Sequence, residues 1–383
     1  MTLNYRRLSW ALLPGCLFLT ACQTDNTPPP TPLSAVAPKE LPVKTVWMRN
    51  VTGGNQNESL NLGSALQGNT VVAVGYEGRV VALNADHGNT LWDISVPGHI
   101  SATPGVNDNS VFVGTMDGTL YALDLKTGKS EWHVQMPSII LGAPAATDDV
   151  VIVQAHDSSV EAYAADTGKM LWSYDGTAPS LSLYSNSSPL IYNGVAYVGF
   201  DNGQLGAFDV YRGVENWQVP IAIPSSPNAI NNLVDIDGTP AEDDNIIFAT
   251  SYHGNVAAVN SPNGELIWQK ALSSFEAPAI GNGKIFATTE TGKVVAIDES
   301  TSQTLWQQSD FLYRFVSPPA VINNEVVVGD LAGYVHFLSM TDGHETARIQ
   351  VGNKGINSAA LVYNSMLIVT GNGGTVAALQ PTS

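Results

Sequence analysis

The chain has 383 residues, of which only 13% are charged, while Gly (35) and Pro (22) are abundant. This composition is typical of many short strands joined by tight turns and argues against helical bundles and coiled coils. The net charge of −18 would repel a polyanion, so we expect no nucleic-acid partner. The two cysteines, Cys16 and Cys22, precede the predicted folded part, which excludes a disulfide scaffold, a cysteine zinc site or a catalytic thiol within it.

Residues 1–21 have the layout of a signal peptide. Two arginines are followed by an apolar stretch from Leu8 to Leu19, which is shorter than the roughly 20 apolar residues that a membrane anchor needs. The stretch ends in Leu-Thr-Ala-Cys22, which resembles the lipobox of bacterial lipoproteins and implies cleavage before Cys22 and lipidation of Cys22. Ordinary secretory cleavage near Ala21 is the alternative. Gln23 stands where Asp would resemble an inner-membrane retention signal, and this favours the outer membrane.

Residues 22–42 are predicted to be the lipidated cysteine and a Pro-rich tether. Six of the twenty residues 23–42 are Pro, and such a run prefers the extended polyproline II conformation and acts as a semi-rigid spacer. At about 3.1 Å per residue, the spacer would reach up to roughly 60 Å from the lipid.

Residues 43–383 carry an internal repeat of roughly 40 residues. Trp closes six of the repeats, with Ala ten residues earlier and usually Gly four residues earlier, as in Ala122–Trp132. The seventh repeat keeps Gly343 but has Ala347 where Trp would stand. A turn in the middle of the repeat recurs eight times, at Gly78, Gly118, Ser158, Gly203, Gly254, Gly292, Gly333 and Gly374.

Each repeat is predicted to form four strands. In the second repeat these are Ala102–Val106, Ser110–Met116, Thr119–Leu125 and Ser130–Gln135, with a strong Asp-Gly hairpin signal between the second and third. Eight such units indicate an all-β fold, an eight-bladed β-propeller of four-stranded antiparallel blades. The turn Gly supplies a positive φ, and the small Ala leaves room for the Trp to pack against the neighbouring blade.

The two ends of the repeat array complete each other. The eighth repeat stops at Leu379 before its fourth strand, whereas Val43–Asn50 is an isolated strand that carries Trp47. We expect the N-terminal strand to pair with the C-terminal blade, which closes the ring and removes an open sheet edge.

The pattern Ala-x-Asp-x-x-Thr-Gly-x-x-x-Trp of Ala122–Trp132 resembles the tryptophan-docking repeat of quinoprotein dehydrogenases, eight-bladed propellers that bind pyrroloquinoline quinone. With its lipobox, the whole chain more closely resembles the BamB family, lipoproteins of the outer-membrane β-barrel assembly (BAM) machinery. The resemblance is clearest in Pro179–Leu183 and Leu233–Pro240, and extends to Ser309–Arg314.

The resemblance to this family implies a non-catalytic scaffold that assists the folding and insertion of β-barrel proteins. The implied partners are the periplasmic domains of BamA and other BAM subunits, with nascent outer-membrane proteins as further candidates. The implied location is the outer membrane of a Gram-negative bacterium, lipid-anchored and facing the periplasm. The residues of the implied BamA-contacting surface are Leu181, Leu183, Asp235 and Asp237, together with Tyr184, which replaces the usual Arg of the family.

Repeat spacing points independently to the same surface. From the closing Trp to the next second strand there are 21 residues in the regular repeats, but 26 from Trp172 to Val198 and 32 from Trp217 to Ala249. The extra residues lie in two consecutive connections on one face of the disc, which predicts a binding surface. Exposed leucines beside acidic groups would suit a partner with an apolar groove and basic side chains. The alternative is that both connections fold back on the propeller.

The sequence bears on three other interpretations of function. A quinoprotein enzyme would need vicinal cysteines and long pocket-forming insertions, and the predicted folded part of this chain lacks both. The seven histidines of this chain show no metal-ligand spacing. We therefore expect no catalytic residue, cofactor or metal. Asp235–Ile246 begins like a calcium loop but has Pro240 and Ile246 where Gly and Glu are required. A propeller that binds a small ligand in its central funnel remains an open alternative.

Overall fold

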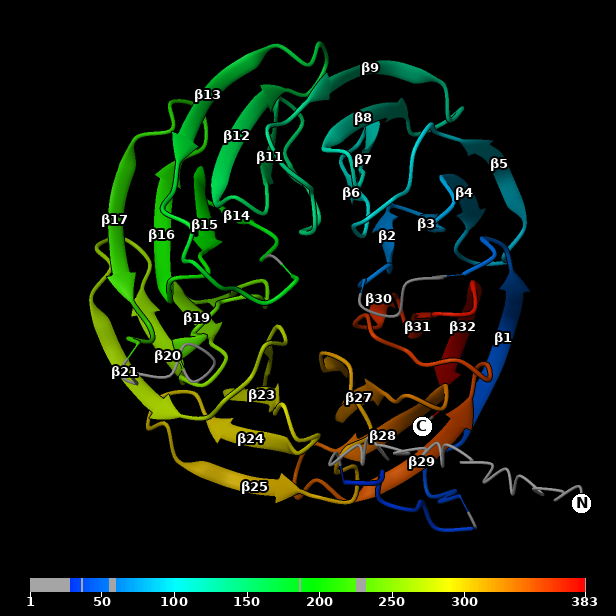
Figure 1. The fold of residues 1–383 in the computed structure, drawn as a ribbon. Coiled ribbons are helices and arrows are strands. Elements are labelled where there is room, and N and C mark those ends of the chain that lie inside the picture. The colour runs from blue at the N-terminus through cyan, green and yellow to red at the C-terminus, as the bar shows by residue number, and fades with distance from the viewer. Residues whose placement is uncertain (1–27, 36, 55–59, 186, 225–231, 383) are drawn as a thin grey trace, which may run out of the picture.

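The computed structural model describes residues 28–35, 37–54, 60–185, 187–224 and 232–382. Their strands form eight four-stranded antiparallel sheets, arranged as blades in a closed ring (Figure 1). The predicted eight-bladed propeller is thus confirmed. Cys22 and the predicted signal peptide lie outside the described residues. Within the ranges just given, no helix is long and apolar enough to cross a membrane.

Blades 1–4 follow one another along the chain, and in each the strands run in order from the ring centre to the outside. Their strands are β2 (Ser64–Gln67), β3 (Thr70–Val74), β4 (Arg79–Asn84) and β5 (Thr90–Ser95); β6 (Gly105–Val106), β7 (Ser110–Gly114), β8 (Thr119–Asp124) and β9 (Ser130–Gln135); β10 (Ala145–Ala146), β11 (Val150–Gln154), β12 (Ser159–Ala164) and β13 (Met170–Asp175); β14 (Leu190–Tyr192), β15 (Val195–Gly199), β16 (Gln204–Asp209) and β17 (Glu215–Pro220).

Blades 5–8 repeat this order, except that the outermost strand of blade 8 is the N-terminal strand. Their strands are β18 (Ala241–Asp243), β19 (Ile246–Thr250), β20 (Asn255–Asn260) and β21 (Leu266–Ala271); β22 (Ala279–Gly281), β23 (Lys284–Thr288), β24 (Val294–Asp298) and β25 (Thr304–Gln308); β26 (Ala320–Ile322), β27 (Glu325–Gly329), β28 (Tyr334–Ser339) and β29 (Glu345–Gln350); β30 (Leu361–Tyr363), β31 (Met366–Gly371), β32 (Thr375–Pro381) and β1 (Val43–Asn50).

The ring closes as predicted, through β1 and β32. These two strands pair antiparallel from Val43 opposite Pro381 to Asn50 opposite Thr375. The pairing converts the open edge of β32 into an internal one.

The core lies between the blades because the middle strands of each blade are buried on both faces. The second and third strands are apolar almost throughout, as in Val150–Gln154, whereas the fourth strands alternate buried and exposed residues, as in Met170–Asp175. The first strands are shorter than predicted. In blade 2 the strand begins at Gly105 and not at Ala102, because Pro104 has no N–H to donate to a ladder.

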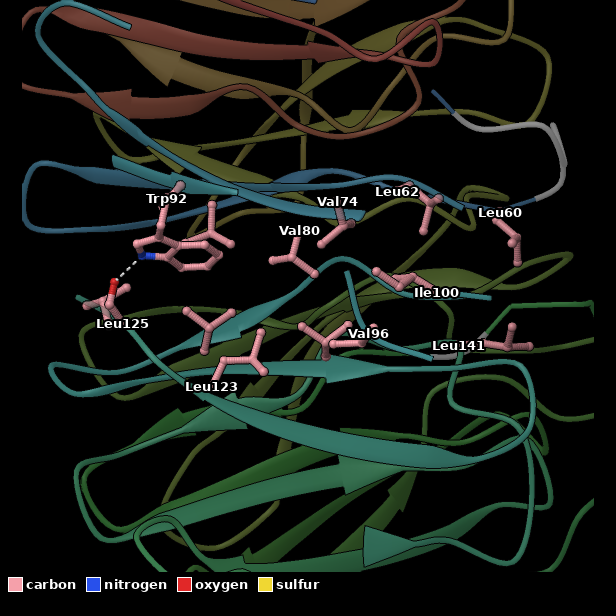
Figure 2. Close-up of a cluster of buried hydrophobic side chains, with 14 residues drawn as sticks. Leu60, Leu62, Val74, Val80, Trp92, Val96, Ile100, Leu123, Leu125 and Leu141 are labelled. Carbon is pink, nitrogen blue, oxygen red and sulfur yellow. Dashed lines mark hydrogen bonds between the residues drawn. The ribbon is translucent and has the colours of Figure 1, made fainter. Parts of the chain in front are cut away.

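In every blade except blade 7, a recurring tryptophan fastens the blade to the next one. Figure 2 shows Trp92 of blade 1 donating its indole N–H to the Leu125 carbonyl of blade 2, at 2.8 Å. The indole also lies against Gly128, where an added Cβ would stand 2.7 Å from the ring. Ala82 is paired with Trp92 across the same blade, and both are buried. The sequence-based expectation for Trp, Ala and Gly is therefore met.

The mid-repeat turns require a positive φ. Gly118 has a φ of +82°, and Ser158 adopts +66° at the equivalent position of blade 3. Blade 5 differs, since the positive φ falls on His253 (+47°) and not on Gly254.

The described part of the predicted tether lies against blade 7. The N–H of Thr31 donates to the Leu312 carbonyl at 2.9 Å, and the N–H groups of Glu40 and Leu41 donate to the Thr346 carbonyl. Lys39 forms a bridge with Ala347. Residues 31–35 and 37–41 therefore do not act as free spacer length, and the reach expected from composition is correspondingly shorter.

Candidate loop-face binding site

The two enlarged connections lie together on one face of the disc. They are residues 176–189, between β13 and β14, and residues 221–240, between β17 and β18, of which 186 and 225–231 are not described. The backbone N–H of Leu183 donates to Oδ2 of Asp235, and the Ser187 hydroxyl donates to the Gly238 carbonyl at 3.2 Å. We call this side of the disc, formed by the connections between blades and the turns between second and third strands, the loop face.

The first connection presents apolar groups to solvent. Leu181 is 47% exposed and Tyr184 42% exposed, whereas Leu183 is half-buried. The Tyr184 ring lies edge-on to His156, with centroids 5.6 Å apart, and its hydroxyl lies 3.8 Å from the sulfur of Met116. These contacts hold Tyr184 over the turns of blades 2 and 3, so the exposed surface is supported from below.

The second connection differs from the expectation, because its acidic side chains point inward. Asp235 is 0% exposed and Asp237 is 7% exposed. The connection folds back on the propeller through Ile236, which is fully buried and whose Cγ2 packs against the Cα of Gly199 so closely that an added Cβ would clash. The N–H of Tyr252 donates to the Asp235 carbonyl at 2.9 Å. The acidic groups that were expected beside the exposed leucines are therefore buried, as in the alternative that the connection folds back on the propeller, and Asp235 holds the first connection through Leu183.

A third carboxyl, Asp201, joins these two from the turn between β15 and β16. Both carboxyl oxygens of Asp201 and of Asp237 are buried without a hydrogen-bond partner among the described residues. Burial, with the nearby charge of Asp235, raises the pKa of Asp201 to about 7 and that of Asp237 well above its usual value. Burial also raises the pKa of Asp235, and raises that of Glu276 to about 8. The protonated forms are favoured because burial disfavours a charged carboxylate, and at Asp201 and Asp237 the neighbouring carboxylates add to this effect.

Sequence reasoning missed two residues of this face. Ile223, in the second connection, is 71% exposed, and an apolar residue within a loop was the available signal. Asp201 sits in a Phe-Asp-Asn-Gly turn that looks like the turns of the other repeats, so nothing in the sequence marked it.

The stretch Ser309–Arg314 belongs to the equivalent connection before blade 7. Arg314 is only 7% exposed, and its Nε and Nη2 donate to Oδ2 of Asp330 at 2.8 and 2.6 Å. The neighbouring Phe315 is 67% exposed. In this stretch the arginine has a structural partner, and the phenylalanine is the group that faces solvent.

The calcium-loop alternative does not fit the fold. Ala241–Asp243 and Ile246–Thr250 pair as the first hairpin of blade 5, so the last three ligand positions of a loop that starts at Asp235 lie on strands. In the described ranges, no group of three or more His, Cys, Asp or Glu side chains is placed to hold a metal ion.

The chain is similar to known proteins in both sequence and fold. A family model described as outer membrane protein assembly factor BamB matches residues 43–139 and 76–308. The chain is 43% identical to the BamB of Pseudomonas aeruginosa PAO1 over 371 residues, which cover 96% of this chain and 97% of the relative. The chain belongs to the BamB family. The BamB proteins of Legionella pneumophila and Escherichia coli K12 are 38% and 32% identical, covering 95% and 96% of both chains respectively.

Solved structures agree with this membership. The crystal structure of BamB from Moraxella catarrhalis has a TM-score of 0.81 at 25% identity and covers 88% of this chain and 99% of its own. A quinohemoprotein alcohol dehydrogenase from Comamonas testosteroni has a TM-score of 0.72 at 14% identity, covering 88% of this chain and 76% of its own, and that likeness concerns the fold alone. The names of the BamB-family relatives are those of assembly factors and not of enzymes, so the quinoprotein interpretation is not favoured.

Proposed function

We propose that this BamB-family chain is a non-catalytic scaffold of the BAM machinery that binds the periplasmic domains of BamA through its loop face. Family membership makes the chain an outer membrane protein assembly factor. The specific partner, BamA, follows from the resemblance of residues 179–183 and 233–240 to the family pattern. The observation that carries the proposal is the hydrogen bond between Leu183 and Asp235, which joins the two enlarged connections into one supported surface.

Within this surface the residues have different roles. Leu181, Leu183 and Tyr184 supply the contacts, because Leu181 and Tyr184 are exposed and Leu183 lies half-buried between them. Asp235 and Asp237 are positioning residues, since their carboxyl groups lie inside the loop face and the first of them holds Leu183. Exposed apolar groups on a rigid frame suit an apolar groove on the partner, because little conformational freedom is lost on binding.

The anchor is also proposed. Cys22 would carry the lipid after removal of residues 1–21, and would place the propeller at the outer membrane, facing the periplasm. Several acyl chains on one cysteine give firm attachment, whereas one chain binds only marginally. Other BAM subunits are further candidate partners. Nascent outer-membrane proteins are also candidates, because the outer strands of most blades have one edge that is not paired with another strand.

Co-purification with BamA tests the proposed function. The double substitution Leu181→Ser and Tyr184→Ser should abolish capture by the BamA periplasmic domains and leave the melting temperature unchanged. Leu91→Ser is the matched control, because Leu91 on β5 is also 47% exposed but lies on an outer strand. Full capture by the double variant would place the interface elsewhere.

A further inference from the structure

Blade 7 lacks the tryptophan that fastens the other blades, and the structure supplies a reason. Trp306 of blade 6 lies against Gly343 in the turn between β28 and β29, and donates to the Met340 carbonyl at 3.1 Å. The corresponding turn of blade 8 does not exist, because β32 ends there and β1 begins there, with Thr382 donating to the Pro42 carbonyl at 2.8 Å. An indole at position 347 would find no turn to dock on.

The N-terminal segment occupies this place. Lys39 forms a bridge with Ala347, and the N–H groups of Glu40 and Leu41 donate to the Thr346 carbonyl at 3.0 and 3.2 Å. Leu41 and Val43 pack against the buried cluster that contains Ala347. The alanine that breaks the sequence repeat thus leaves room for the chain's own N-terminal segment on the outer edge of blade 7.

The same segment continues to the loop face. Arg348 Nη2 donates to the Ser34 carbonyl at 2.8 Å, and Arg314 Nη1 donates to the Thr31 carbonyl at 3.0 Å. Leu33 packs against the cluster that contains Trp306 and Phe311. We call residues 31–35 and 37–41 the strap.

The two arginines that hold the strap are fixed from beneath. Arg314 donates twice to Asp330, which also bonds to the fully buried His336 at 3.2 Å. Burial alone would raise the pKa of Asp330, but hydrogen bonds from His336 and Arg314 hold it below its usual value. The side chain of Arg348 is 4% exposed, with its Nε 3.9 Å from Glu345. Preorganised donors of this kind bind an extended backbone with little further loss of side-chain entropy.

We propose that the strap fixes the point at which the N-terminal lipid anchor leaves the disc, at the loop face between blades 6 and 7, and so holds this rim toward the membrane surface. The inference rests on the proposed lipidation of Cys22. Thr31 is bound beside Leu312, in the connection between β25 and β26. Only residues 23–30 separate Cys22 from Thr31, and the nine residue steps between these two positions span about 28 Å in polyproline II. The candidate binding loops, between blades 3 and 5, lie further round the same face.

Energy transfer to the bilayer tests this orientation. The lipidated full chain is bound to phosphatidylethanolamine–phosphatidylglycerol vesicles that contain a rhodamine-labelled lipid, with a donor dye on Asp310→Cys or on Thr177→Cys. Both positions are exposed and on the loop face, the first beside the strap and the second in the candidate binding site. Transfer should be higher from position 310, and this difference should be lost when Thr31→Pro and Leu33→Ser release the strap. Leu266→Ser, on the outer strand of blade 5, is the control and should keep the difference.

The outcomes separate the two proposals. Equal transfer from both positions with normal vesicle binding would overturn the strap inference and leave the anchor standing. Failure of the chain to bind vesicles would overturn the proposed anchor itself, and the inference with it.

A second measurement needs no membrane. Trypsin should cut the full chain after Lys39 about tenfold faster in the Thr31→Pro, Leu33→Ser variant than in the unmodified protein, because cleavage requires local release of the strap. Equal cleavage rates, with equal melting temperatures, would show that the strap is not held in solution and would overturn the inference.

Discussion

The backbone N–H of Leu183 donates a hydrogen bond to the buried carboxyl group of Asp235, 52 residues further along the chain. This contact joins two connections that are separated in the sequence by the whole of blade 4. It also gives an acidic residue of the family pattern a role within the protein, where its carboxyl group is hidden from a partner.

The role of Asp235 is tested by comparing Asp235→Ala with Asp235→Asn. Alanine leaves the Leu183 N–H without an acceptor, so hydrogen exchange at this amide should become roughly ten- to a hundredfold faster. Asparagine retains an acceptor oxygen and should give a smaller change, and it should also retain most of the BamA capture. If both variants lost capture equally while the Leu183 amide stayed protected, Asp235 would contact the partner directly.

The interblade tryptophans should dominate stability. Trp92→Ala removes a buried indole and its bond to Leu125, and should lower the free energy of unfolding by about 3–5 kcal/mol. Leu91→Ala, on the adjacent exposed position of the same strand, should change it by less than about 0.5 kcal/mol. Urea denaturation of the two variants measures the difference, and comparable effects would contradict the fastening role.

Stability should fall as the pH rises from mildly acidic to mildly basic. Unfolded Asp and Glu titrate near pH 4, whereas the folded-state pKa is about 7 for Asp201 and about 8 for Glu276. Between these values the folded state binds more protons than the unfolded state, so the free energy of unfolding decreases with pH. The melting temperature should therefore be lower at pH 8.5 than at pH 5.5.

Asp201→Asn should flatten this pH dependence, because the amide does not titrate. Asp93→Asn is the control: its ion pair with Arg79 lowers the pKa of Asp93, so its titration falls below the range measured. An unchanged slope in Asp201→Asn would argue against a buried, protonated carboxyl at this position.

A disulfide across the ring closure should stabilise the propeller. Lys44 of β1 lies directly opposite Gln380 of β32, and such positions in an antiparallel pair are about 5 Å apart at Cβ. The double variant Lys44→Cys, Gln380→Cys should gain about 2–4 kcal/mol when oxidised, because the link restricts the unfolded chain. The gain should disappear on reduction and should be absent from Lys44→Cys alone. A destabilised oxidised form would show that the closure is strained.

The amino-acid sequence was enough to predict the eight blades, their order and the closure by the N-terminal strand. These features follow from local rules, since a mid-repeat turn recurs eight times and Gly stands four residues before Trp in five repeats, as in Gly88 and Trp92. Repeat spacing also located the two enlarged connections, because an insertion is visible wherever the period is regular. The BamB family followed from motifs in the same stretches.

Which side chains of those connections face outward depends on how the connections pack against the ring. Asp235 and Asp237 looked like surface charges, but the burial of Ile236 against Gly199 turns their segment inward. The contact between Lys39 and Ala347 could not be predicted either, because the two residues are more than 300 positions apart in the chain. The composition of the tether favours an extended conformation, but it does not indicate which surface the tether lies against. Burial and long-range pairing depend on the packing of the closed ring, and a local sequence pattern does not encode the contacts that the ring brings together.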